Sequence, residues 1–174
     1  MSYTALLRAH LEALLTGAAG NTRTLPAGRF HLRRANPGAG TPPERAVAVR
    51  VLPAFPDAPV NSLDSLAIVT HPVDVEVRYA LTAGGDDLAE GLTEQDGPGA
   101  REAAEDRAGV DAADIAAVLC WHENWPISGD DPAVIDVYQR DAAPTLTADG
   151  GTLVLALPYA VRVQARLSTQ PYAP

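Results

Sequence analysis

Apolar and charged residues alternate strictly along one stretch in the middle of the chain. Residues 73–81 read Val-Asp-Val-Glu-Val-Arg-Tyr-Ala-Leu, which puts apolar side chains at every second position. Because successive side chains of a strand point to opposite faces, this pattern predicts a strand with one buried and one exposed face. A short apolar run, residues 66–70, precedes it, and Pro72 lies between the two. Proline is tolerated at a strand start or edge, so residues 66–81 form either one bent strand or two.

Four further stretches are predicted to be strands. Residues 47–51 alternate in the same way, and residues 153–163 keep apolar residues in one phase over the length of a second long strand. Residues 29–33 and 134–140 are shorter candidates. Pro158 falls in the other phase of the last strand, which predicts that it marks an edge or a bulge.

The N-terminal residues show the spacing of an amphipathic helix. Leucines recur at positions 7, 11, 14 and 15. Ser2 is the expected N-terminal cap, and Gly17 the expected end. This stripe predicts a helix that lies against a sheet.

The region between the central and the final strands predicts further helical structure. Residues 101–107 are expected to form a short, charged helix. Asp111 is expected to cap a separate helix, because Asp114 follows three residues later and an apolar stripe begins at Ile115. The two helices are therefore predicted to be distinct.

These elements predict a single α+β domain over residues 1–174. Its mixed or antiparallel sheet is flanked by the N-terminal helix and by a second helix between strands. Residues 17–43 and 82–109 are expected to be long loops, and three prolines between residues 53 and 59 to impose an extended connector. About half of residues 82–131, which carry 13 acids and two arginines, is expected to be loosely held.

Charge is distributed unevenly along the chain. The net charge is -9; residues 1–53 contribute +5 (seven Arg, two acids) and residues 54–174 contribute -14 (six Arg, 20 acids). An acidic chain is disfavoured as a general nucleic-acid binder. No apolar run of about 18 residues predicts a membrane span, and a single cysteine excludes an internal disulfide.

One short stretch resembles a metal site. Cys120-Trp121-His122-Glu123 offers a thiol, an imidazole and a carboxylate, but Cys120 and His122 point to different sides of a helix and no second pair of ligands follows. No nucleophile elbow and no phosphate-binding glycine loop is present. We therefore expect no enzymatic activity, no metal and no cofactor.

The two tryptophans, Trp121 and Trp125, lie at the predicted end of the last helix. Core packing is the favoured interpretation of both, with an oligomer interface as the alternative.

Three segments, taken with the order of the predicted elements, resemble one known family. They are Val73-Asp74-Val75-Glu76-Val77-Arg78-Tyr79, the helix start Asp111-Ala112-Ala113-Asp114-Ile115, and the closing Leu153-Val154-Leu155-Ala156-Leu157 with Val161-Arg162-Val163. In this order, residues 3–167 resemble the tail terminator proteins, also called tail completion proteins, of long-tailed bacteriophages and phage-derived particles.

The resemblance implies a structural, non-enzymatic α/β subunit that forms a homohexameric ring at the head-proximal end of the virion tail. It implies assembly in the bacterial host cytoplasm, an end to polymerisation of the tail tube, and a surface for joining head and neck. The implied partners are further copies of the chain, the tail tube protein and a neck or head-completion protein. DNA would pass through the lumen without specific binding, and no membrane is involved.

Two alternatives remain open at this point. One is another head-to-tail neck or connector ring, or the cap of an injection machine. The other, from a different class, is a small non-enzymatic ligand-binding or regulatory domain with a closed apolar pocket.

A ring requires head-to-tail interfaces, in which one patch meets a different patch of the neighbour. The arginines of the first third and the acids of residues 82–109 supply patches of opposite charge. The predicted subunit interface comprises Arg29, Arg33, Arg34, Asp86, Asp87, Glu90, Glu94, Trp121 and Trp125.

Overall fold

The computed structural model describes residues 3–18, 23–33, 45–57, 66–80, 97–125, 133–149 and 152–166. It confirms the predicted fold class, an α+β domain with one mixed sheet, an N-terminal helix and a second helix between strands. The helices are α1 (Tyr3–Thr16), α2 (Gly97–Leu119) and the 3-10 helix η2 (His122–Asn124). The strands are β1 (His31–Leu32), β2 (Ala46–Val51), β3 (Phe55–Pro56), β4 (Leu66–Ala80), β5 (Ala133–Gln139), β6 (Thr145–Asp149) and β7 (Thr152–Arg166).

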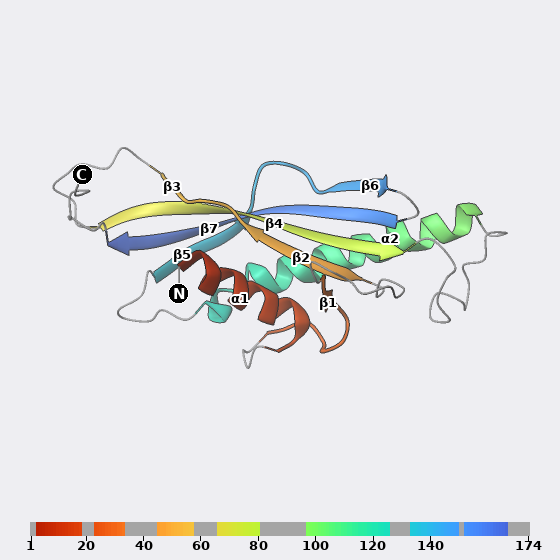
Figure 1. Cartoon of the computed structure of the whole chain (residues 1–174), viewed down its shortest axis with the longest axis horizontal. Helices are drawn as coiled ribbons and strands as arrows, with labels where there is room; N and C mark the ends of the chain where they lie inside the picture. Colours follow the sequence, from red (N-terminus) through yellow and green to blue (C-terminus); the bar gives the residue numbers. More distant parts are fainter. Residues whose placement is uncertain are drawn as a thin grey trace.

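Two long antiparallel strands, β4 and β7, form the centre of the sheet (Figure 1). They pair over their full length, so each has one remaining edge. β2 and β3 follow one another along the free edge of β4, and β5 and β6 do so along the free edge of β7. β1 extends the sheet beyond β2 as its one parallel pair among the described strands. Residues 66–80 are thus one strand.

Along each central strand there is a short gap, which we call a joint, where one short neighbouring strand ends and the other begins. Each central strand carries a proline at this joint. Pro72 lies between the positions paired with β2 and β3, and Pro158 between those paired with β5 and β6. The Pro72 carbonyl accepts the Leu52 N–H at 2.8 Å, and the Pro158 carbonyl accepts the Arg140 N–H at 3.0 Å. Because the N and O atoms of one strand residue point to the same side, each missing N–H faces a joint. Pro158 therefore marks neither an edge nor a bulge of β7, contrary to the prediction.

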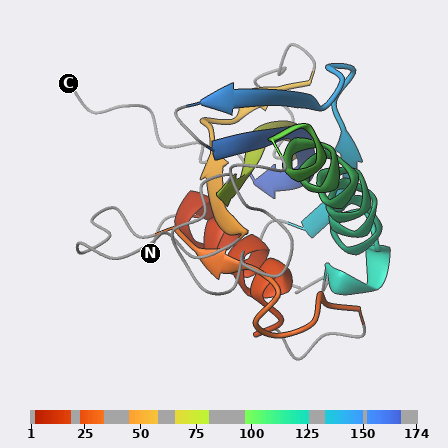
Figure 2. The same ribbon diagram turned by 90° about the vertical axis from the view of Figure 1, so that its right-hand side faces the viewer.

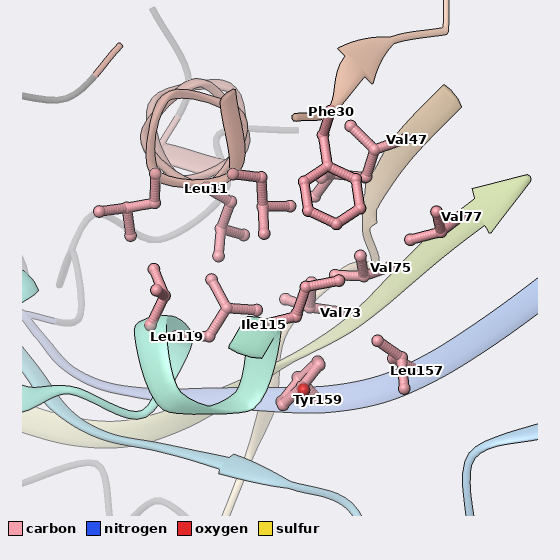
Figure 3. Close-up of a cluster of buried hydrophobic side chains, with 14 of the residues drawn as sticks. Leu11, Phe30, Val47, Val73, Val75, Val77, Ile115, Leu119, Leu157 and Tyr159 are labelled. Carbon is pink, nitrogen blue, oxygen red and sulfur yellow. The ribbon is translucent and has the colours of Figure 1, made fainter. Parts of the chain in front are cut away.

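Both helices cover the same face of the sheet. α1 lies beside β2, and α2 lies beside β5 and β7 (Figure 2). The predicted phase of β4 and β7 is confirmed, since their alternating apolar residues are buried against the helices together with the four leucines of α1 (Figure 3). These buried residues are Leu7, Leu11, Leu14, Leu15, Val73, Val75, Val77, Tyr79, Leu153, Leu155, Leu157, Tyr159, Val161 and Val163.

The end of α1 also follows the prediction. Gly17 adopts a φ of +73° directly after the helix, where a Cβ would lie 2.5 Å from the Leu25 carbonyl oxygen. Glycine is therefore required both for the left-handed backbone and for the close approach of the returning chain.

The α2 helix corrects three predictions. It runs without interruption from Gly97 to Leu119, so residues 97–109 are not loop, residues 101–107 are not a separate helix, and Asp111 is not an N-terminal cap. Ala104 and Ala108 are buried and continue the stripe that reaches Ile115, which explains why the helix extends further. Residues 82–96, the rest of the predicted loop, lie outside the described residues.

Three short strands also differ from what the sequence predicted. Only His31–Leu32 of residues 29–33 is a strand. Phe55–Pro56, within the predicted proline connector, pairs with Val69 and Thr70. Thr145–Asp149 was not predicted, because Leu146 and Ala148 give too short an alternation to stand out, but it forms β6 against the start of β7.

Candidate interaction surface

A buried carboxylate connects α2 to the β1–β2 edge of the sheet. The Asp111 side chain is 0% exposed and accepts a hydrogen bond from the Tyr79 hydroxyl at 2.8 Å. Oδ2 accepts this hydrogen bond and also lies 3.0 Å from Nε of Arg45. The other oxygen, Oδ1, lies 2.6 Å from Nη2 of Arg29. We call these four residues the Asp111 anchor. Two cations and a hydroxyl compensate the desolvation of this charge.

The Asp111 anchor also determines the ionisation of its members. Burial, followed by the negative charge of Asp111, raises the pKa of the Tyr79 hydroxyl, which stays protonated and donates. Desolvation would lower the pKa of Arg29, but the hydrogen bonds that Arg29 donates to Asp111 and Asp114, together with the negative charge of both, outweigh it and raise the pKa. Arg29 therefore stays charged, and the Tyr79 hydroxyl stays neutral, over the ordinary pH range.

The anchor occupies Arg29 within the subunit. Arg29 is 18% exposed and makes a second ion pair, 2.7 Å from Asp114. It therefore does not present a free charge, and its role as an interface residue stays a prediction. Arg29 precedes β1 and Arg45 precedes β2, so one carboxylate positions the start of both strands.

An open groove of about 700 Å³ runs along β2. We call it the β2 groove. Its lining comes from α1 (Thr4, Ala5 and Arg8), from Arg33 after β1, from residues 48–51 of β2, from residues 74–76 of β4, and from Ala156 of β7.

The backbone of β2 points free hydrogen-bonding groups into this groove. The carbonyls of Arg45 and Val47 accept the N–H groups of His31 and Arg33, at 3.2 and 2.8 Å, on the side away from β4. Backbone groups alternate between the two sides of a strand, so those of Val49 and Val51 also point away from β4. β1 ends at Leu32, and no described residue hydrogen-bonds to these groups of Val49 and Val51. The second half of β2 is therefore an open edge in the described part of the chain.

The side chains of the β2 groove carry an excess of positive charge. Arg8, Arg33 and Arg50 line it, against Asp74 and Glu76. The acids are already paired: Asp74 with Arg140, and Glu76 with Arg78 as well as with Arg33. Arg50 is exposed and makes no ion pair with any described residue. Arg8 is paired with Glu12, 3.6 Å away, and Arg33 with Glu76, so Arg50 is the lining arginine that pairs with no described residue, and the charged side chains of the lining sum to +1.

The predicted interface residues are distributed differently from the prediction. Arg33 lies in the β2 groove, 46% exposed. Arg34, Asp86, Asp87, Glu90 and Glu94 lie outside the described residues.

The two tryptophans have different environments. Trp125 is 7% exposed, donates its Nε1–H to the Leu119 carbonyl at 2.8 Å, and lies 4.9 Å from the His10 ring. The core interpretation is confirmed for Trp125, whose burial leaves little of it for a neighbour to contact, and its interface role stays a prediction. Trp121 is half-buried with the Arg23 guanidinium 5.0 Å from its ring centre, and its interface role stays a prediction.

The sequence did not reveal the roles of Asp111 in the anchor and of Arg8 and Arg50 in the β2 groove. A signal for Asp111 was present, because it follows Ala104 and Ala108 on the buried face of one helix. Arg8 and Arg50 gave no signal, since only the fold brings them to one groove.

The structure gives little support to chemistry at Cys120. Desolvation and the negative charge of Asp136 raise the pKa of its thiol, which opposes a reactive thiolate. Among the described residues, no three His, Cys, Asp or Glu side chains are grouped so that they could hold a metal ion.

Comparison of the chain with models of known protein families and with curated proteins found no match. None of the described helices combines the length and apolar character needed to cross a membrane.

Proposed function

We propose that this protein is a structural subunit that assembles with further copies of itself into a ring of the tail terminator type. In this role it ends polymerisation of a phage tail tube and offers a surface for joining the head. The observation that supports the proposal most is the open, cationic edge of β2, because a head-to-tail ring requires a surface that its neighbour completes.

Two further observations support an assembly role. The order of helix, strands, helix and final strands is that of the layout on which the resemblance rests, although the second helix begins at Gly97 and not at Asp111. The β2 groove is open and lined by charged side chains, whereas a small-ligand-binding domain calls for an enclosed, mostly apolar pocket.

Solution mass is the first test. We expect light scattering and native mass spectrometry of the full chain to show a closed ring, six copies being the number that the resemblance implies. Electron microscopy of the same sample should show a central opening. A monomer or dimer at all concentrations would contradict the proposal and favour the ligand-binding alternative.

Removal of the protein tests its position in a virion. In a phage that encodes this chain, deletion should give tails of uncontrolled length that do not join heads, and expression from a plasmid should restore both. Normal tails attached to heads would exclude the terminator role even if the chain forms a ring.

A further inference from the structure

The open edge of β2 has the features of a site for strand addition. Val49 and Val51 point their N–H and C=O groups into the β2 groove, unpaired by any described residue. An extended segment placed there would satisfy these groups and continue the sheet beyond β2, in line with β1. Main-chain hydrogen bonds of this kind give affinity to β-strand addition, while side chains beside the edge give specificity.

The charge beside the edge defines the chemistry of the added segment. Arg8, Arg33 and Arg50 flank the groove against Asp74 and Glu76; Arg8 and Arg33 have partners of their own, Glu12 and Glu76, whereas Arg50 pairs with no described residue. A segment rich in carboxylates would therefore gain favourable charge contacts, and a basic segment would be repelled.

This chain contains one segment of that composition. Residues 82–96 carry Asp86, Asp87, Glu90, Glu94 and Asp96 without any arginine, a net charge of -5. Every copy of the protein therefore carries both a cationic groove and an acidic segment. That combination suits a head-to-tail contact, in which each subunit gives one patch and receives the other.

We infer that the β2 groove binds the acidic segment 82–96 of a second copy of this chain, added as an extended strand at Val49 and Val51. The inference rests on the proposed ring and deepens it by identifying the contact that joins neighbours. It adds Arg50, which pairs with no described residue, as a cation of the interface.

Substitution at Val51 tests the backbone contact. Val51→Pro removes an N–H that faces the groove and leaves the hydrogen bonds to β4 in place, because those use the alternate residues. Val51→Ala is the matched control, since it shortens the side chain but keeps the N–H. We expect Val51→Pro to weaken assembly about tenfold or more and Val51→Ala to assemble nearly as the parent does.

Charge reversal tests the electrostatic contact. Arg50→Glu should weaken assembly about tenfold or more, and Arg107→Glu, which makes the same charge change at an exposed position on α2 outside the groove, should not. Circular dichroism and thermal unfolding of each variant establish that the subunit is folded. Equal assembly of both variants and the parent would overturn the inference while the proposed ring stands.

A synthetic peptide with the sequence of residues 82–96 tests the site directly. When it is added to the full-length Arg50→Glu variant and to the parent, fluorescence anisotropy should show binding to the parent. The same peptide with its acids changed to Asn and Gln should bind about tenfold more weakly or not at all.

Amide hydrogen exchange gives the decisive readout. Peptide binding or assembly should slow exchange at Val49 and Val51 about tenfold or more, with the amides of β6 as the internal control. Unchanged exchange at Val49 and Val51 in an assembled ring would overturn strand addition without affecting the proposed function. A parent chain that never assembles would contradict the proposed function, and with it a second copy as the occupant.

Discussion

Two arginines four residues apart, Arg29 and Arg33, belong to different environments. Arg29 lies in the Asp111 anchor, where a fully buried carboxylate holds it. Arg33 lies in the β2 groove, where its partner Glu76 is itself partly exposed and shared with Arg78. One region uses its charges to fix the subunit, and the other leaves charge and backbone groups available.

The two regions differ because the desolvation cost of a buried charge is much larger than that of an exposed charge. A buried ion is destabilising unless all its partners are present. The loss of one member of the Asp111 anchor therefore leaves a buried charge whose desolvation is no longer compensated. An exposed pair in the groove contributes about 0–1 kcal/mol, because water and salt replace the partner. Substitutions in the two regions should therefore separate stability from assembly.

The largest effect is expected where β4 faces the core. Val75→Asp places an unpaired carboxylate at a fully buried position, and we expect a loss of about 3–5 kcal/mol in the free energy of unfolding. Glu76→Gln, one residue further and facing the groove, should change it by less than about 1 kcal/mol. Denaturant unfolding measures both, and equal midpoints would contradict the assignment of the two faces.

The second-largest loss of stability is expected when the charge of Asp111 is removed. Asp111→Asn keeps the shape but leaves Arg45 without its counter-charge and Arg29 with Asp114 alone, so we expect a loss of about 3 kcal/mol. The control is Asp114→Asn, which affects an ion pair whose carboxylate is much more exposed and should cost less than about 1 kcal/mol. If the two substitutions are equally mild, the anchor does not hold the sheet edge to α2.

Loss of the Tyr79 hydroxyl should have a smaller effect. Tyr79→Phe removes a hydrogen bond to a buried carboxylate, with an expected cost of about 2 kcal/mol at neutral pH. The variant also leaves the Asp111 anchor intact on the Arg29 and Arg45 side, which distinguishes it from Asp111→Asn.

Alkaline pH provides a second test of Tyr79. Its folded pKa lies above the ordinary value near 10, so the unfolded chain loses this proton first. The contribution is complete below about pH 10 and is lost as the pH rises further. The parent should lose stability more steeply than Tyr79→Phe in that range, and parallel losses would show that Tyr79 is not the group responsible.

The smallest effect on folding is expected in the β2 groove. Arg50→Ala should change the free energy of unfolding by less than about 0.5 kcal/mol, since the side chain is exposed and pairs with no described residue. Thermal unfolding of the isolated subunit measures this, preferably at low salt. A clear destabilisation would show that Arg50 contributes to the subunit itself and would remove the contrast with the Asp111 anchor.

The sequence predicted the parts of the fold that depend on periodicity. The alternation around Val75 and Leu155 identified both central strands and their buried faces, and the leucine stripe identified α1. The class of fold follows from these elements, because each has one apolar face to cover.

The sequence could not predict the parts that depend on tertiary contacts. Asp111 has the local features of a helix cap, and only Tyr79 and Arg45, distant in sequence, show that it is a buried anion. Val49 and Val51 alternate in the manner of any half-buried strand, so nothing local indicates an open edge. The β2 groove is likewise a product of topology.

The prolines at the two joints have a consequence for how the strands align. A long run of alternating valines can slip by two residues without moving any side chain to the wrong face. Such a slip of β2 along β4 would set Arg50 opposite Pro72, whose missing N–H would leave the Arg50 carbonyl without a donor. Pro158 imposes the same penalty on a slip of β5 along β7. The two prolines thus disfavour a slip in this direction, which the valine pattern alone does not.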